Sequence, residues 1–225
     1  MSDIQASAVM RAEVIARHGL RQTGALPSAA TGIVLLVHGR GATAESILQL
    51  ADMIAMPELC YLAPQAEGFS WYPQSFMAPT AANEPYLSRA LQRLAAIIAG
   101  ILDSGIAPAR LGVIGFSQGA CLASETMLRN PMAYGFAGIL SGGAIGPPGT
   151  PRDYPGSLAG TRVFLGCAAQ DPHIPLGRVK ETTAAFTRMG ASVTERIYPG
   201  SSHGINEDEL AALRTGLRQI APQSP

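Results

Sequence analysis

The sequence predicts an α/β fold in which a doubly wound, mostly parallel sheet carries helices on both faces. Two observations predict it: short apolar runs recur along the chain, and segments with helical character separate them. The runs are continuous rather than alternating, which is typical of strands buried on both faces of a sheet. Strands that alternate with helices pair in parallel. The 225 residues suffice for a substantial core, so a single domain over 1–225 is expected.

The first half of the chain contains two of the predicted strands. Residues 33–37 are apolar throughout and stop at a His-Gly pair, and 44–55 then has helical character. A second short strand, 59–63, ends at a proline. The residues that follow, 64–84, are expected to form a long loop because they contain prolines, glycines and aromatic residues but no periodic pattern.

The second half continues the alternation of strands and helices. The clearest helix, 84–102, has leucines and isoleucines at helical spacing. The apolar run 111–114 predicts a strand, and the helix over 118–129 ends where Asn130 precedes a proline. The remaining predicted elements are strands at 136–140, 162–165 and 193–198 and helices at 175–189 and 207–220.

Charge and cysteine content exclude several classes of protein. Lysines plus arginines and aspartates plus glutamates number 16 each, and the basic residues form no stripe. We therefore expect neither nucleic acid nor an anionic membrane as a partner. The three cysteines form no CxxC pair, which disfavours a structural zinc site and fits a reducing compartment.

No segment predicts secretion or membrane insertion. Polar and acidic residues stand before Arg11, where a signal peptide would have its apolar region. The longest apolar stretch, 94–102, contains a glycine and has about half the length that a bilayer requires. We therefore expect a soluble, cytoplasmic protein without stable membrane insertion.

Four predicted strands are followed by motifs whose residue types could take part in catalysis. They lie at the sheet edge where such folds place their sites. The sequence G-F-S-Q-G at 115–119 follows one strand and opens a helix. It matches the G-x-S-x-G turn that lifts a serine hydroxyl clear of the sheet, with flanking glycines because side chains there would clash. The alternative is a serine that only caps the helix. We interpret Ser117 as a nucleophile.

The sequence H-G-R-G at 38–41 follows the first strand, where an oxyanion loop is expected. Its glycines would let backbone N–H groups approach a substrate carbonyl oxygen, and the predicted donors are the N–H groups of Arg40 and Gln118. The alternative is a plain turn between strand and helix. His38 precedes the serine, the wrong order for a catalytic base in this fold, so we interpret it as a structural residue.

Asp171 and His203 follow the last two strands, in the chain order serine, acid, histidine. An acid at Asp171 would orient the imidazole of His203 and stabilise its charged form. Asp153 is a rival acid, but it lies before its strand, at the wrong end. His173 is a rival base that would share a short loop with its own acid, and His18 lies too early in the chain. A turn-forming aspartate and an idle loop histidine are the structural alternatives.

These residues resemble the phospholipase/carboxylesterase family of α/β-hydrolases, which includes acyl-protein thioesterases and bacterial carboxylesterases. The resemblance extends from about Gly32 to the last helix. Its carriers are L-V-H-G-R-G at 36–41, G-F-S-Q-G-A at 115–120, L-S-G at 140–142, D-P-H-I-P at 171–175 and H-G at 203–204. The resemblance implies an α/β-hydrolase fold and places the family's triad at Ser117, Asp171 and His203.

Two departures from the family pattern border the acyl site. Family members often carry an apolar residue and then Gly-Asp after the His-Gly pair, where this chain has R-G-A at 40–42. Thioesterase-like members often carry an acid after an aromatic pair, where this chain has W-Y-P at 71–73. The chain is therefore more similar to the bacterial carboxylesterase branch. The side chain of Arg40 could offer a charge near the substrate or point into solvent.

The loop over 69–77 holds the only tryptophan. Its apolar residues could line an acyl pocket or pin the loop to the core, and we name Trp71, Tyr72, Phe76 and Met77 as candidate substrate contacts. The segment after 141–143 is too short and too rich in glycine and proline for a helical lid, so an open, shallow site is expected.

The predicted function is hydrolysis of short- to medium-chain carboxylic esters through a covalent acyl-enzyme, with no metal or organic cofactor. Alternatives with the same triad are an acyl thioesterase and a lysophospholipase. A peptidase is a further alternative, although the usual insertions over its site are missing from the sequence. A non-catalytic binding module on the same scaffold is the alternative of another class. A small-molecule ester is the expected partner, and an apolar rim around an open site could support a homodimer.

Overall fold

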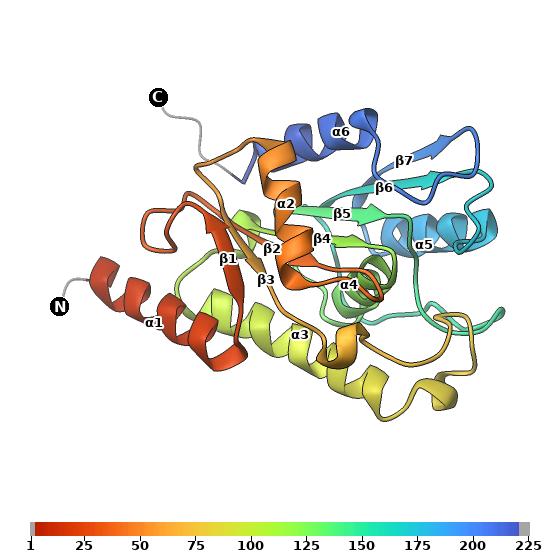
Figure 1. The fold of residues 1–225 in the computed structure, drawn as a ribbon, viewed down its shortest axis with the longest axis horizontal. Helices are drawn as coiled ribbons and strands as arrows, with labels where there is room; N and C mark the ends of the chain where they lie inside the picture. Colours follow the sequence, from red (N-terminus) through yellow and green to blue (C-terminus); the bar gives the residue numbers. More distant parts are fainter. Residues whose placement is uncertain (1–2, 221–225) are drawn as a thin grey trace.

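The computed structural model describes residues 3–220, which form seven strands and six α-helices around one sheet (Figure 1). The strands lie in the order β1-β3-β2-β4-β5-β6-β7. Their bounds are β1 Arg21–Gly24, β2 Ile33–Val37, β3 Cys60–Ala63, β4 Leu111–Phe116, β5 Phe136–Leu140, β6 Arg162–Ala168 and β7 Ser192–Tyr198.

The sheet is parallel from β3 to β7, and only β1 runs antiparallel to its neighbour. In the centre, Val37 of β2 is opposite Gly115 of β4, and Phe116 is opposite Leu140 of β5. This register brings the carboxyl ends of β2, β4 and β5 to the same edge of the sheet, which is where the motifs of the sequence begin. The predicted doubly wound, mostly parallel sheet is confirmed.

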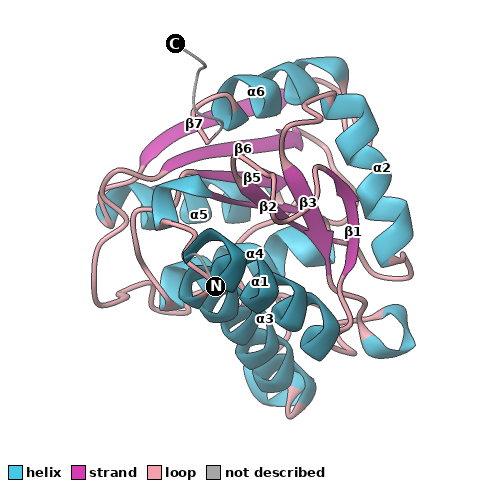
Figure 2. Ribbon diagram, turned by 90° about the vertical axis from the view of Figure 1, so that its left-hand side faces the viewer, coloured by secondary structure: helices cyan, strands magenta, loops and turns pink. Residues whose placement is uncertain are grey.

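The helices cover both faces of the sheet. Helices α2 and α6 lie on one face, and α1, α3, α4 and α5 lie on the other (Figure 2). Their bounds are α1 Asp3–His18, α2 Ala44–Ile54, α3 Tyr86–Asp103, α4 Gln118–Arg129, α5 Leu176–Arg188 and α6 Glu207–Leu217.

Two hydrophobic cores explain why the central strands are apolar at every position. In β2, Ile33, Leu35 and Val37 pack into the core under α3 and α4, while Val34 and Leu36 pack into the core under α2 and α6. Side chains of a strand alternate between faces. A strand covered on both faces therefore has no position left for a polar side chain, as the uninterrupted run predicts.

Two elements near the N-terminus were not predicted from the sequence. Helix α1 packs Val14 against the core beneath α3, and β1 pairs with β3 at the sheet edge. Strand β1 has the sequence R-Q-T-G and is largely exposed, so it lacks the apolar residues by which strands are recognised. Its Arg21 forms an ion pair with Glu45 of α2 at 2.7 Å.

No helix forms between β5 and β6 in this described part of the chain, so a helical lid is absent, as predicted. The segment 141–161 instead consists of turns and extended backbone. Within residues 3–220, no helix is both long and apolar enough to cross a membrane.

Candidate active site

Ser117 lies at the turn between β4 and α4 with a backbone conformation that is rare for a residue with a side chain. Its φ is 54° and its ψ is −121°. The turn tolerates no Cβ at its flanks: one on Gly115 would overlap the backbone of Gly119 and Ala120, and one on Gly119 would overlap the carbonyl groups of Val37 and His38. Such conformations persist only where the surrounding structure imposes them, and they concentrate at functional sites.

Ser117, His203 and Asp171 form a hydrogen-bonded series. The Ser117 hydroxyl lies 2.9 Å from Nε2 of His203, and Nδ1 of His203 lies 2.8 Å from Oδ2 of Asp171. The three residues come from the ends of β4, β6 and β7, as predicted from chain order. With Nδ1 protonated toward the carboxylate, Nε2 is free to accept the serine proton. The arrangement is therefore suited to activating Ser117 as a nucleophile.

Asp171 is held as a carboxylate. Burial opposes its ionisation, but the hydrogen bond from His203 and the backbone N–H groups of His173 and Ile174 outweigh burial, and the pKa of Asp171 is lowered from its usual value. The two N–H groups donate to Oδ1 at 2.8 and 3.0 Å, which leaves Oδ2 for the imidazole. The negative charge thus faces His203 in a fixed direction.

The residues considered as alternatives to Asp171 and His203 either lie away from Ser117 or make other contacts. Asp153 is exposed on the 141–161 segment, and His18 ends α1. His38 is fully buried, and its Nε2 accepts the Ala66 N–H at 3.0 Å while Nδ1 lies 2.8 Å from the Gly39 carbonyl. These contacts, and the burial that lowers the pKa of His38, fit a neutral structural imidazole. His173 lies beside the site, with its ring centroid 4.8 Å from that of His203.

The backbone N–H groups of Arg40 and Gln118 are available at the edge of the same site. Within residues 3–220, neither group has a hydrogen-bond acceptor. Gln118 is the first residue of α4, where helix geometry leaves N–H groups unpaired. The turn at 38–41 is fixed from outside, since the Gly41 N–H donates to the Phe69 carbonyl at 2.7 Å and Nε1 of Trp71 donates to the His38 carbonyl at 2.8 Å.

The side chain of Arg40 neither points freely into solvent nor forms an ion pair within the described residues. Its guanidinium group donates to Oγ of Ser70 at 2.9 Å, to the Pro73 carbonyl at 2.9 Å and to the Gln74 carbonyl at 2.7 Å. It also lies over the ring of Tyr72, 5.9 Å from the ring centroid. Arg40 therefore ties the turn after β2 to the loop that follows β3.

A cavity of about 660 Å³ opens at Ser117. Of the four predicted substrate contacts, Tyr72 and Phe76 line this cavity. Trp71 and Met77 do not belong to its lining: the Trp71 ring packs against the His38 ring at 4.9 Å, and Met77 packs against the hydrophobic core. The aromatic residues of the loop thus have two roles: Tyr72 and Phe76 line the cavity, while Trp71 attaches the loop to the turn after β2.

The side chain of Gln118 holds the loop that forms the cavity wall, a role that the sequence analysis did not assign. Its Oε1 accepts the Trp71 N–H at 3.0 Å, and its Nε2 donates to the Tyr72 carbonyl at 2.8 Å. Gln118 is buried. The extended motif F-S-Q-G-A has a glutamine directly after Ser117, and once that side chain is buried it requires polar partners nearby.

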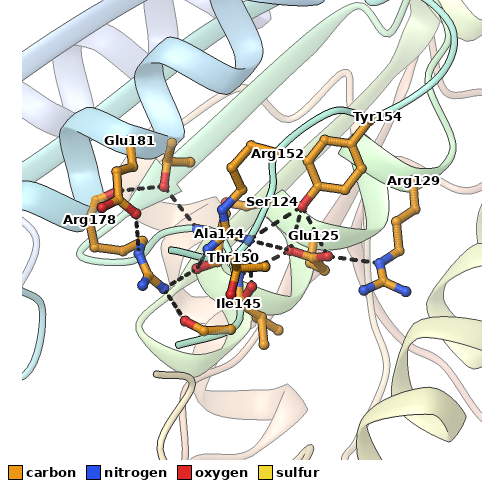
Figure 3. A network of polar contacts seen from close by, with 12 residues as sticks. Ser124, Glu125, Arg129, Ala144, Ile145, Thr150, Arg152, Tyr154, Arg178 and Glu181 are labelled. Carbon is orange, nitrogen blue, oxygen red and sulfur yellow. Dashed lines mark hydrogen bonds and ion pairs between the residues drawn. The ribbon is translucent and has the colours of Figure 1, made fainter. Parts of the chain in front are cut away.

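A second polar network, centred on Glu125 of α4, was also missed (Figure 3). The buried carboxylate accepts the Arg129 Nε–H at 2.8 Å, the Ile145 N–H at 3.0 Å and the Tyr154 hydroxyl at 3.1 Å, and Nη1 of Arg152 lies 3.6 Å away. The network holds the 141–161 segment against α4.

Arg178 of α5 extends this network toward the cavity (Figure 3). It donates to the carbonyl groups of Ala144 and Gly146 at 2.7 and 2.8 Å, and its guanidinium carbon lies 5.6 Å from the centroid of the Phe76 ring. The Gly146 N–H in turn donates to the Phe76 carbonyl at 2.8 Å. The position of this cavity wall is therefore fixed by the segment after β5.

No group of three or more His, Cys, Asp or Glu residues between positions 3 and 220 is arranged to hold a metal ion. Cys121 lines the cavity near Ser117, but burial raises the pKa of its thiol to about 12. The thiolate is the reactive form of cysteine, so the hydroxyl of Ser117 is a better candidate for a nucleophile than the Cys121 thiol.

Comparison with known proteins places the chain in a family. The family model described as phospholipase/carboxylesterase matches residues 22–221. A probable carboxylesterase of Oryza sativa subsp. japonica is 25% identical over 210 residues, which cover 85% of this chain and 89% of the relative. Acyl-protein thioesterase 1 of Saccharomyces cerevisiae is 29% identical over 121 residues, covering 52% of this chain and 53% of the relative.

Among solved structures, a phospholipase/carboxylesterase from Dyadobacter fermentans is similar, with a TM-score of 0.84 and 37% sequence identity. The match covers 88% of this chain and 95% of that chain. A carboxylesterase from Mesorhizobium loti has a TM-score of 0.66 and 26% identity, over 84% of this chain and 89% of that chain. The chain therefore belongs to the phospholipase/carboxylesterase family and has the α/β-hydrolase fold of that family.

Proposed function

We propose that the protein is a serine carboxylesterase that hydrolyses short- to medium-chain carboxylic esters. The observation that carries the proposal is the hydrogen-bonded series from Ser117 through His203 to Asp171, with Ser117 on a strained turn that faces a cavity. The carboxylesterase names of relatives support the choice of reaction.

In the proposed mechanism, Oγ of Ser117 attacks the ester carbonyl carbon while Nε2 of His203 accepts the hydroxyl proton. The oxygen of the tetrahedral intermediate accepts hydrogen bonds from the N–H groups of Arg40 and Gln118, and one such donor lowers the barrier by about 3–4 kcal/mol. His203 then protonates the departing alkoxide, and an acyl-enzyme on Ser117 remains. Water attacks this ester with His203 again as the base, which releases the acid and restores the serine. No step requires a metal or an organic cofactor.

The proposed preference for short and medium chains rests on the walls of the cavity. Tyr72 and Phe76 form part of the lining; the ring of Phe76 lies beside Arg178, and the Phe76 carbonyl accepts a hydrogen bond from the Gly146 N–H of the segment after β5. We expect these rings to limit the length of acyl chain that the cavity accepts. The absence of a helix between β5 and β6 leaves no helical lid to shelter such a chain in the described structure.

Hydrolysis of p-nitrophenyl esters from acetate to palmitate tests the proposal, with Ser117→Ala as the variant. We expect activity to peak at short chains and kcat to fall by about 10⁴- to 10⁶-fold in the variant. Ser201→Ala, an exposed serine on the loop that carries His203, is the control and should retain activity. A fluorophosphonate probe should label the wild type and the control but not Ser117→Ala. An unlabelled, inactive wild type would instead point to a non-catalytic binding module.

An acyl thioesterase is the second candidate, because the acyl-protein thioesterase of yeast is among the relatives. The same triad would serve both reactions, so the substrate profile decides between them. Matched oxygen esters and thioesters with the same acyl chain would separate the candidates. A clear preference in kcat/KM for the thioesters, strongest for long chains, would favour the thioesterase.

Three further predictions concern the whole chain. We propose one domain over 1–225, because a single sheet runs through the described residues. A cytoplasmic location is supported by three cysteines that are all free and buried. A homodimer stays a prediction, and light scattering after size-exclusion chromatography would test it.

A further inference from the structure

We propose that the site prefers esters that carry a second, negatively charged group, a carboxylate, and that the guanidinium group of Arg40 binds this group. The inference rests on the proposed function and deepens it, since it names the class of ester. It depends on the charges that line the cavity, on the way Arg40 is held, and on the contrast between Arg40 and other arginines of the chain.

The cavity at Ser117 has an unbalanced charge. Of the described residues that line it, Arg40 is the only one with a permanent charge, and none is an aspartate or a glutamate. The carboxylate of Asp171 is nearby, but its side chain is fully enclosed and hydrogen-bonds to His203. A ligand in the cavity therefore meets a fixed cation and no exposed carboxylate, an arrangement that favours anions.

The guanidinium group is held in place without being neutralised. Its three acceptors, on Ser70, Pro73 and Gln74, are all uncharged oxygens. A guanidinium group has five N–H donors, and these contacts use three of them, so two have no acceptor among residues 3–220. Because the side chain is already ordered, an incoming carboxylate would not have to restrict it, and pre-ordering of this kind favours binding.

Two arginines that hold the segment after β5 through carbonyl groups lie beside a carboxylate, whereas Arg93 and Arg214 bind carbonyl groups elsewhere without an ion pair among residues 3–220. Arg178 pairs with Glu181 at 2.9 Å, and Arg152 lies 3.6 Å from Glu125. Arg40 has no such partner among residues 3–220, although it is the one of the three that lines the cavity at Ser117. What distinguishes Arg40 from Arg93 and Arg214 is that Arg40 lines the cavity at Ser117 and they do not. We therefore assign the charge of Arg40 to substrate recognition.

Pairs of substrates that differ only in charge test this assignment. On the acyl side, the mono-p-nitrophenyl ester of glutaric acid is compared with its hydrocarbon isostere, in which an isopropyl group replaces the carboxylate. On the alcohol side, acetate esters of carboxyphenol and isopropylphenol form the second pair. The quantity measured is the ratio of kcat/KM for the charged ester to that for the neutral ester, which cancels any general effect of a variant on the loop.

We expect the ratio to favour the charged ester in one of the two pairs, which identifies the side of the ester that faces Arg40. Arg40→Gln keeps the backbone N–H and should lower this ratio about tenfold, mainly through KM, as expected for one partly exposed charge-assisted contact. Arg40→Lys should retain most of the ratio, and added salt should reduce it. Arg89→Gln, which removes an exposed arginine of a neighbouring cavity, should leave it unchanged.

The inference would be overturned if the ratio of kcat/KM for charged to neutral ester were the same in wild type and Arg40→Gln for both pairs. Arg40 would then only hold the loop in place. The proposed esterase activity would still stand in that case, because the neutral esters report it independently. Binding of glutarate to the Ser117→Ala protein, measured by calorimetry, gives a readout that needs no turnover. We expect about tenfold weaker binding when Arg40→Gln is added, and equal binding would likewise contradict the proposal.

Discussion

Helix α4 carries two polar networks of opposite character, one at its first turn and the other about two turns further along. At the first, Ser117, His203 and Asp171 are joined in series, and the last atom of the series, Oγ of Ser117, lies at a cavity. At the second, four groups converge on the single carboxylate of Glu125, which is buried.

The difference lies in what each network leaves open. The Glu125 network closes on itself and fastens a segment that lacks regular secondary structure, so its hydrogen bonds contribute to the folded state. The Ser117 network ends at a hydroxyl on a strained backbone, and its histidine is about one-fifth exposed. Hydrogen bonds alone therefore do not identify a reactive site. An unclosed end, a cavity and a backbone outlier together support the proposal of a reactive site at Ser117.

Of the three carboxylates Asp171, Glu125 and Glu209, Asp171 is expected to show the largest effect when it is replaced. Asp171→Asn keeps the shape of the side chain but would favour the wrong tautomer of His203, so kcat should fall by about 10⁴-fold, or about 5 kcal/mol in barrier. Steady-state hydrolysis of p-nitrophenyl acetate measures this. Asp153→Asn, at the rival acid, should retain activity. A loss below tenfold in Asp171→Asn would remove the proposed role of this carboxylate.

Breaking the closed network should act on stability instead. Glu125→Gln leaves the buried guanidinium group of Arg152 without its counter-charge, which should lower the free energy of unfolding by about 3–5 kcal/mol in urea titrations. The specific activity of the folded fraction should stay close to that of the wild type. Arg129→Gln is the control: Arg129 is half exposed, so its loss should change stability by about 1 kcal/mol or less. Equal effects of both variants would contradict this account of the network.

Glu209 is a third buried carboxylate, and it differs from Glu125 because only one of its two oxygens has a hydrogen-bond partner among residues 3–220. Its Oε2 accepts the Asn206 N–H at 2.8 Å, whereas Oε1 has no partner among residues 3–220. Burial raises the pKa of Glu209, and the Asn206 N–H opposes this only in part. Folding therefore favours the protonated form, and stability is lost as the pH rises from the unfolded pKa through the higher folded pKa.

Replacing Glu209 with Gln should remove this pH dependence, and the effect is expected to be the smallest of the three. The free energy of unfolding of Glu209→Gln, relative to the wild type, should increase as the pH rises above the ordinary pKa of a glutamate, about 4.3. Chemical unfolding at several pH values measures the difference. Glu207→Gln, an exposed neighbour on the same turn, should show no such trend. A relative stability that falls with pH would show that the ionised Glu209 is favoured in the folded state.

The central strands and the three residues of the series could be predicted because local sequence determines them. The apolar run of β2 admits only burial on both faces, and glycines flank Ser117 because the turn has no room for side chains. The order of Ser117, Asp171 and His203 along the chain follows from the order of the strands that carry them.

The parts that could not be predicted depend on contacts between distant segments. Trp71 and Tyr72 are adjacent aromatic residues, yet only Tyr72 lines the cavity, because Trp71 reaches the carbonyl group of His38. The acceptors of Arg40 lie some thirty residues further along the chain. Strand β1 was missed for a different reason: it is exposed, so its polar sequence lacks the signal of a buried strand.

The two edges of the sheet have a consequence for association between copies. β1 is short and polar, and β7 carries Glu195 and Arg196 on a largely accessible strand. Short and charged edge strands resist pairing with a strand from another molecule, which is a common protection against aggregation. Pairing between the sheet edges of two copies is therefore disfavoured, and we expect any association between copies to use helices or loops.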